Sequence, residues 1–157
     1  MTYQEKKNIV NIISALLITV IYALIVFQRH QDGRFDLTED YTKWGIIFLI
    51  FIGVSIGARI IIYIIFHIIN AIATQEEDIP VTDERDKLVE LKGTRNSYYT
   101  FSIGFALAII SMSIGLTPVF LFIAFFVCCL LGDIVGNISQ IYYYRKGIWN
   151  EQILYTE

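Results

Sequence analysis

One stretch limits the fold of this chain more than any other: residues 44–73 form an almost unbroken run of isoleucine, phenylalanine and valine. About 20 apolar residues suffice for a helix to cross the ~30 Å hydrocarbon layer of a bilayer, so the run predicts a transmembrane helix. Its one charged residue is Arg59, and an isolated arginine in the middle of a membrane helix costs at least about 2.5–3.5 kcal/mol. We expect Arg59 to face a partner or a wet cavity, and Asp133 is the conspicuous partner in the sequence.

The composition agrees with a membrane protein. Of 157 residues, 55% are hydrophobic and 17% are charged, which is too apolar for a soluble domain. The long apolar runs predict one all-α domain of four transmembrane helices, arranged as two antiparallel hairpins. The expected helices are residues 9–27, 44–73, 98–116 and 119–142, with a cytoplasmic connector at 74–97 and an interfacial tail at 147–157.

The distribution of lysine and arginine predicts the orientation in the membrane. Eight of these residues lie in the N-terminal segment, the 74–97 connector and the segment after residue 142, whereas three lie in the 28–43 loop. Because positive residues are retained on the cytoplasmic side, we expect both termini in the cytoplasm of a bacterial inner membrane. The same imbalance disfavours insertion in both orientations. No basic block indicates nucleic acid, so no direct nucleic-acid partner is expected.

Small residues are concentrated in helix 98–116, and such residues let helices approach closely in lipid. We therefore expect this helix to be central in the bundle. The second helix of each half also carries a Gly-xxx-Gly motif, Gly53/Gly57 and Gly132/Gly136, which predicts a weak twofold repeat. The small residues of the third helix are Gly104, Ala106, Ala108, Ser111, Ser113 and Gly115.

The depth of the two intramembrane charges follows from counting residues. Arg59 lies 15 residues after Trp44, and Asp133 lies 15 residues after Pro118, so both are about 22 Å from the outer boundary. In an up-down bundle their helices are diagonal, so the pair is expected across the core or between subunits of a homo-oligomer. Other polar residues recur at helical spacing and predict a pocket open to the cytoplasm. These residues are Ser55, Tyr63, His67 and Asn70 on one helix, Asn137, Gln140 and Tyr144 on the other, and Asn11 and Ser14 on the first.

Two interpretations of this pocket remain open. In the first, Arg59 binds an anion or carboxylate, Asp133 is its counter-ion or a proton carrier, and His67 titrates. In the second, Arg59 and Asp133 form an ion pair that fixes the helix register, and His67 is a polar interface residue. The predicted binding or ion-pair residues are Arg59, Asp133, Tyr63, His67, Asn137 and Gln140.

The sequence contains neither HExxH nor a P-loop. Neither enzymatic activity nor a cofactor is therefore predicted. No metal site is expected, because His30 has no second histidine near it. Cys128 and Cys129 are adjacent and point to different faces of a helix.

The 74–97 connector contains its own helix signal. Thr82 is a suitable N-cap, and Asp83 and Glu84 suit the positive end of the helix dipole. We predict a short cytoplasmic helix between helices two and three, the alternative being a solvated continuation of helix three. Asp83, Arg85 and Glu90 are the predicted contacts with a cytosolic partner.

Residues 83–92, followed by Arg95-Asn96-Ser97-Tyr98-Tyr99 at the head of a membrane helix, resemble a pattern of uncharacterised small bacterial four-helix integral membrane proteins. The genes of that family are often neighbours of genes for helix-turn-helix regulators. The resemblance implies an accessory or signalling role, as a sensor or regulatory subunit that contacts a cytosolic regulatory protein.

A second functional hypothesis is a homo-oligomeric transporter or channel for a small solute or ion, using the Arg59/Asp133 pocket. The chain is similar in size to dimeric four-helix exporters and fluoride channels, and Gly57-Ala58-Arg59 resembles a glycine-arginine motif of the latter. It departs from both families, because its first helix has no glutamate and its charge bias opposes dual topology. A purely structural membrane component is the third hypothesis.

Overall fold

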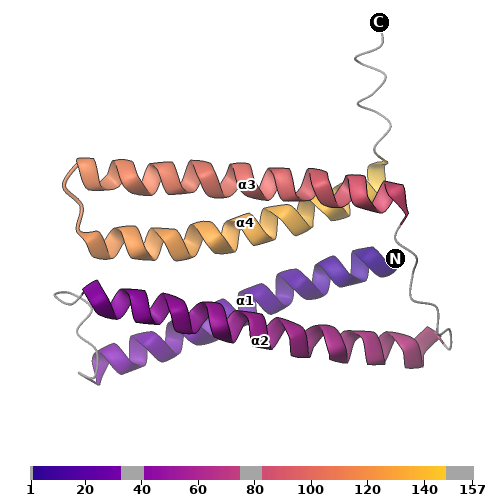
Figure 1. The fold of residues 1–157 in the computed structure, drawn as a ribbon, viewed down its shortest axis with the longest axis horizontal. Helices are drawn as coiled ribbons and strands as arrows, with labels where there is room; N and C mark the ends of the chain where they lie inside the picture. The colour runs from indigo at the N-terminus through magenta and orange to yellow at the C-terminus, as the bar shows by residue number, and fades with distance from the viewer. Residues whose placement is uncertain (1, 33–40, 75–82, 148–157) are drawn as a thin grey trace, which may run out of the picture.

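The structure of the chain, a computed structural model, describes residues 2–32, 41–74 and 83–147. These residues form four helices: α1 (Tyr3–Gln31), α2 (Tyr41–Thr74), α3 (Glu84–Ser113) and α4 (Pro118–Lys146) (Figure 1). The prediction of an all-α fold is confirmed. Three of the helices, α1, α2 and α4, are long and apolar enough to cross a membrane. The predicted N-cap at Thr82 and the interfacial tail after Gly147 lie outside the described residues.

All four helices begin before the apolar runs that predicted them. In α1, Thr2 and Glu5 form a capping box: the Thr2 hydroxyl accepts from the Glu5 backbone N–H at 3.3 Å, and Glu5 Oε2 accepts from the Thr2 N–H at 2.9 Å. This box satisfies two of the backbone donors that a helix start leaves free. Polar residues at the helix start therefore extend α1 six residues beyond its predicted boundary.

The prediction of a separate short helix in the connector is wrong. Asp83 is the N-cap of α3, and Asp86 completes a capping box with it. From Glu84 the helix continues without a break to Ser113, so the charge-rich segment is the first part of α3. No proline interrupts this stretch, and neither Gly93 nor Gly104 ends the helix, because both pack against α4. The alternative, a continuation of the third helix, describes the structure.

The helices run alternately up and down (Figure 1). At one end, which we call the N-terminal end, α1 and α3 begin and α2 and α4 end. Figure 1 also shows α1 crossing behind α2, while α1 contacts α4 both near the N-terminal end, at Asn11 and Asn137, and farther along, at Tyr22 and Phe126. The central element is α4, which has extensive contacts with α3 and further contacts with α1. Helix three was expected at the centre, but among the described residues its extensive contacts are with α4 alone.

The α3–α4 hairpin is packed through glycines. A Cβ on Gly136 would lie 3.0 Å from Ser97 Cβ and 3.5 Å from the Gly93 carbonyl oxygen, and one on Gly132 would lie 3.4 Å from the Ser97 carbonyl. At Gly104 it would lie 2.5 Å from the sulfur of Cys128. The small residues of α3 and the Gly-xxx-Gly motif of α4 thus serve one interface, in which two backbones approach closely.

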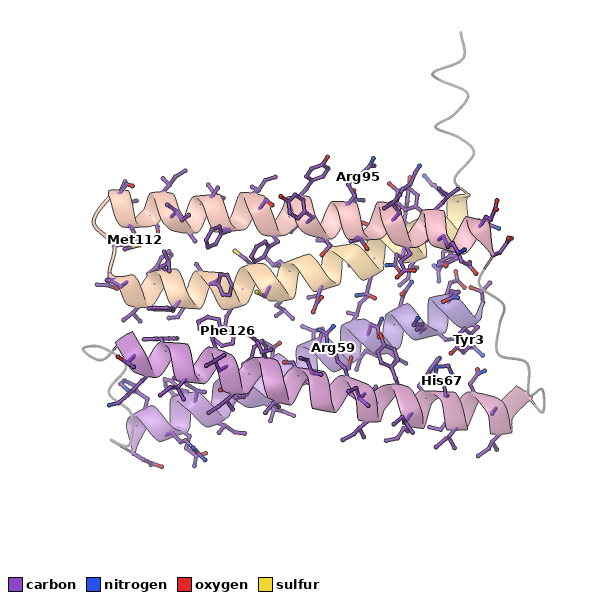
Figure 2. All side chains as sticks on the ribbon, viewed as in Figure 1. Tyr3, Arg59, His67, Arg95, Met112 and Phe126 are labelled. Atoms are coloured by element: carbon purple, nitrogen blue, oxygen red, sulfur yellow. The ribbon has the colours of Figure 1, made fainter. Side chains whose placement is uncertain are left out.

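Aromatic side chains join α2 to α4 at the opposite end of the bundle. The rings of Trp44 and Phe122 are stacked with centroids 5.1 Å apart, and those of Phe48 and Phe126 are stacked at 4.2 Å. Trp44 is buried there, and Figure 2 shows Phe126 pointing from α4 toward α2. Although helices two and four were expected to be diagonal, they are in side-chain contact. Their two charges can therefore meet without crossing the core.

Candidate functional site

The two intramembrane charges meet directly. Arg59 Nη2 on α2 donates a hydrogen bond to Asp133 Oδ2 on α4, so the two residues form the ion pair that was expected from their equal spacing along the two helices. Figure 2 shows Arg59 pointing from α2 into the space between the helices. Neither side chain is sealed: the Arg59 side chain is 39% exposed and that of Asp133 is 41% exposed. In the structure, which holds one copy of the chain, the pair forms within that copy.

Beside the ion pair is a pocket of about 230 Å³ between α1, α2 and α4. Its polar lining comes from Arg59, Asp133, Ser55 and Thr19. Ser55 precedes Arg59 by one helical turn, and its hydroxyl is buried without a hydrogen-bond partner among the described residues. We call this volume the ion-pair pocket. The rest of its lining is Ala15, Ile18, Phe51, Ile52, Ile56, Cys129 and Leu130.

Asn137 links the site to α1. Its Nδ2 donates to the backbone carbonyl of Asp133 at 2.7 Å, and its Oδ1 accepts from Asn11 Nδ2 at 3.1 Å. One turn nearer the N-terminal end, Asn8 is buried, and its Nδ2 has no hydrogen-bond partner among the described residues. Because buried amide groups usually have a hydrogen-bond partner, the Asn8 side chain is a further free donor at this interface. Polar groups therefore continue from Asp133 along the α1–α4 interface.

Glu5 is a polar residue of this interface that the sequence analysis did not select. Arg145 Nε, near the end of α4, donates to Glu5 Oε1 at 3.0 Å, while the other carboxylate oxygen belongs to the capping box. Glu5 is only 7% exposed. The Thr2-x-x-Glu5 spacing is the capping-box pattern, so the sequence did contain a signal for this carboxylate, although none for Arg145 as its partner.

Tyr63 and His67, two predicted site residues, lie on the α1–α2 interface nearer the N-terminal end. The Tyr3 hydroxyl is 3.2 Å from both ring nitrogens of His67, and Lys7 Nζ lies 5.8 Å from the centre of the Tyr63 ring. Figure 2 shows Tyr3 beside His67. Neither Tyr63 nor His67 lines the ion-pair pocket. They attach α1 to α2 instead.

Gln140, also a predicted site residue, is placed at a different interface. A Cβ on Gly93 of α3 would lie 2.4 Å from Gln140 Cγ. Gln140 therefore packs against α3 and is not a lining residue of the pocket. Its spacing of seven residues from Asp133 put it on the same face of an ideal helix. The side chain, however, covers the glycine of the neighbouring helix.

The three predicted partner-contact residues differ in their surroundings. Asp83 caps α3, and Arg85 donates to the Tyr144 carbonyl at 3.3 Å, so both have structural roles. Glu90 is exposed. On the same segment Val89 is fully buried, while Leu88 and Leu91 are 49% and 66% exposed. The outer face of this segment is thus partly apolar.

Comparison with known proteins adds no relative: no family model, no curated protein and no solved structure matches the chain. Within the part of the chain that the structure describes, no group of three or more histidine, cysteine, aspartate and glutamate residues is placed to hold a metal ion. The geometry around Arg59 and Asp133 is therefore the basis for a functional proposal.

Proposed function

We propose that this chain is a small integral membrane protein that acts as a sensor or regulatory subunit and binds a small polar or charged ligand in the ion-pair pocket. The observation that supports this most is that Arg59 and Asp133 border an open volume and are not enclosed by neighbouring side chains. If the ion pair had only a structural role, we would expect neighbouring side chains to fill this volume, because an unfilled gap loses van der Waals contacts. A buried hydroxyl without a partner, Ser55 Oγ, adds a second binding group.

The proposed placement in the membrane has α3 as a fourth span. Its support is that no charged residue occurs between Arg95 and Asp133 and that α3 packs along α4, which is itself long and apolar enough to span. The lysine and arginine distribution favours the N-terminal end in the cytoplasm of a bacterial inner membrane. In this orientation the charge-rich start of α3 is cytoplasmic.

A path for regulation leads from the pocket to this segment. Asp133 lies on α4 between Gly132 and Gly136, the two glycines that pack on Ser97 of α3. From Ser97 the helix continues unbroken to Glu84. A ligand that draws Arg59 away from Asp133 therefore acts beside the α3–α4 contact, and α3 carries the change toward a cytosolic partner.

The outer face of α3 offers a surface for such a partner. Leu88, Leu91, Arg95 and Tyr98 are exposed and follow one another at intervals of three or four residues, which places them on one helix face. Figure 2 shows Arg95 pointing away from α4. An apolar stripe flanked by charges is the usual form of a helix that binds in a groove of another protein.

Ligand binding is tested by thermal unfolding of the full chain in lipid nanodiscs with acetate, chloride, glycine and methylammonium as probes. A ligand that binds only the folded state raises the midpoint. We expect at least one probe to raise the midpoint of the unaltered chain but not that of the Arg59→Gln/Asp133→Asn double variant, which removes both charges together. Glu90→Gln is the matched control. Equal shifts in all three proteins would contradict binding at this site.

The regulatory role is tested by co-purification of a soluble protein with the full chain. Leu91→Asp and Glu90→Lys should release the partner, because both positions are exposed. Retention of the partner through both changes would exclude this face. Asp83 and Arg85 are less suitable for this test, since their loss also weakens the start of α3.

A second candidate function, transport of a small solute or ion, is favoured by one observation. The polar groups of Asn137, Asn11, Asn8 and Glu5 extend from the pocket to the N-terminal end. Solute or ion flux into liposomes that is lost on Asp133→Asn would support this function. Flux that persists unchanged in that variant would exclude the pocket as its pathway.

A further inference from the structure

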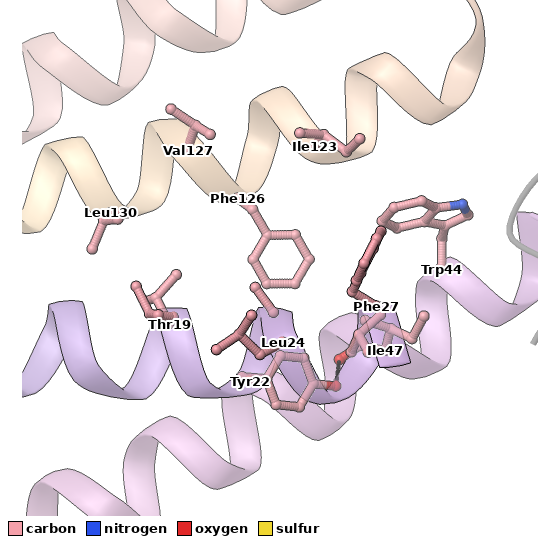
Figure 3. A pocket seen from close by; sticks show the side chains of 13 residues that line it. Thr19, Tyr22, Leu24, Phe27, Trp44, Ile47, Ile123, Phe126, Val127 and Leu130 are labelled. Carbon is pink, nitrogen blue, oxygen red and sulfur yellow. Dashed lines mark hydrogen bonds between the residues drawn. The ribbon is translucent and has the colours of Figure 1, made fainter. Parts of the chain in front are cut away.

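A second, larger pocket of about 490 Å³ lies next to the ion-pair pocket, and its lining is almost entirely apolar. Figure 3 shows it between α4 on one side and α1 and α2 on the other, with Thr19 and Leu130 at one end and Trp44 at the other. We call it the apolar pocket. Its remaining lining is Val20, Tyr22, Ala23, Leu24, Val26, Phe27, Ile47, Ile123, Phe126 and Val127.

The apolar pocket results from the course of α1. Near the N-terminal end α1 is tied to α4 by Asn11 and Asn137, whereas farther along the Tyr22 hydroxyl donates to the Ile47 carbonyl of α2 at 2.7 Å. Helix α1 therefore leaves α4 and crosses to α2, as Figure 1 shows. The wedge that opens between α1 and α4 is the apolar pocket.

The two pockets are adjacent, because Thr19 and Leu130 line both. Taken together, they have a charged end at Arg59 and Asp133 and an apolar end at Phe27 and Trp44. A molecule that fits both ends has a polar head and an apolar chain. A head group bound at Arg59 would distinguish such a ligand from the lipids that only surround the protein.

The charged end has hydrogen-bond donors that the ion pair leaves free. A guanidinium has five N–H donors, and the Arg59–Asp133 pair uses one nitrogen of Arg59 and one oxygen of Asp133. The hydroxyls of Ser55 and Thr19 add further donors. The only charged acceptor in the lining is Asp133, and one of its two oxygens accepts from Arg59. The head group that suits this end is therefore an acceptor, and a carboxylate matches the fork of a guanidinium.

We infer that the two pockets form one binding site for a long-chain carboxylate, with its head at Arg59 and Ser55 and its chain in the apolar pocket. This inference rests on the proposed function, for which it names the ligand class. The hydrocarbon chain of the ligand makes apolar contacts along α1 and α4. Its carboxylate head provides selectivity against molecules of the same length that cannot accept a hydrogen bond from Arg59. Membrane-derived carboxylates thereby become the signal to which the protein responds.

The test is binding of oleate, oleyl alcohol, oleylamine and acetate to the full chain in phosphatidylcholine nanodiscs, measured by displacement of a spin-labelled fatty acid. Oleate should bind at least about tenfold more tightly than the alcohol or the amine, a difference of about 1.4 kcal/mol. Equal affinity for all three long-chain probes would overturn the inference, because the head would then contribute nothing.

Two variants separate the ends of the site. Ala23→Trp fills the apolar pocket, and Arg59→Gln/Asp133→Asn neutralises the head site; each should weaken oleate binding at least about tenfold. Leu49→Trp is the matched control, because Leu49 is exposed on α2 and lines neither pocket. Oleate binding that Ala23→Trp does not change would overturn the inference.

Acetate distinguishes failure of this inference from failure of the proposed function. If acetate binding depends on Arg59 and Asp133 and oleate binds no more tightly than acetate, the ion-pair pocket still binds a ligand. Only the long-chain class of ligand is then excluded. If neither probe depends on the two charges, carboxylate binding at the pocket fails altogether. Unfolding midpoints of each variant show whether lost binding reflects a lost fold.

Discussion

Two Gly-xxx-Gly motifs in this chain have opposite surroundings. In α4, Gly132 and Gly136 pack against Ser97 of α3 so closely that an added Cβ would touch it. In α2, an added Cβ on Gly53 or Gly57 would find nothing within 4 Å. The motif permits close approach of backbones but does not by itself produce it. The difference lies in the partner: α3 offers small residues, whereas α2 meets α4 through Trp44 and large phenylalanines.

The same contrast separates the two halves of the molecule. The α3–α4 hairpin is held by direct backbone approach, while α1 and α2 are attached through side-chain contacts, such as those of Asn11, Tyr22 and Arg59. Both pockets described above are lined by α1, α2 and α4, and neither includes a residue of α3. Close packing and a binding site thus occupy different parts of the fold.

The largest expected effect comes from filling the tight interface. Gly136→Leu should destabilise the chain by about 2–3 kcal/mol, because its side chain would meet Ser97 and the Gly93 carbonyl. Gly57→Leu is the matched control and should change stability by less than about 0.5 kcal/mol. The measurement is unfolding in mixed detergent micelles. Equal losses in both variants would mean that α2 also has a close partner.

Next in size is the loss of one intramembrane charge. Asp133→Ala leaves Arg59 without its partner and should cost about 2 kcal/mol. The Arg59→Gln/Asp133→Asn double variant should recover most of this stability, since no isolated charge remains. Unfolding midpoints of the two proteins provide the comparison. A double variant no more stable than Asp133→Ala would show that the ion pair is not what the single change disrupts.

A smaller effect is expected at the α1–α4 contact. Asn137→Ala removes the hydrogen bonds to Asn11 and to the Asp133 carbonyl and should cost about 1 kcal/mol. A double-mutant cycle with Asn11→Ala should give a coupling energy of about 0.6 kcal/mol, the average for hydrogen bonds between membrane helices. Strict additivity of the two changes would exclude the contact.

The smallest effect concerns the tie between α1 and α2. Tyr22→Phe keeps the ring contacts with Phe51 and Phe126 but loses the bond to the Ile47 carbonyl, for an expected cost of about 0.6 kcal/mol. This variant should also increase hydrogen exchange in α1 more than in α3. An equal increase of hydrogen exchange in α1 and α3 would contradict the distinction between the two halves of the molecule.

Spacing alone predicted much of the site. Fifteen residues from each boundary placed Arg59 and Asp133 at one level, and Asn137 followed Asp133 at the interval of one turn. Spacing failed for Gln140, because the face of α4 that carries it is covered by α3, and the sequence of one helix does not say which neighbour covers which face. It failed for Glu5 because its partner, Arg145, is 140 residues away.

The fold shows the same division between local and long-range information. Apolar runs gave four helices and their order, and the short turn at Gly115 gave the α3–α4 hairpin. The central position of α4 was missed, because small residues in α3 indicate one close neighbour and not how many neighbours a helix has. The continuity of α3 was only the alternative prediction, because a change from charged to apolar residues resembles a boundary between two helices.

The position of α4 after α1 and α2 in the sequence has a consequence for biosynthesis. Ribosomes deliver α1 and α2 to the membrane first, yet the side chains that satisfy their polar groups, Asp133, Asn137 and Arg145, all emerge with the last helix. Arg59 thus precedes its counter-charge by 74 residues of synthesis. Until α4 is made, the Arg59 guanidinium lacks this counter-charge, and the proposed placement in the membrane predicts that it stays near the lipid head groups during this interval.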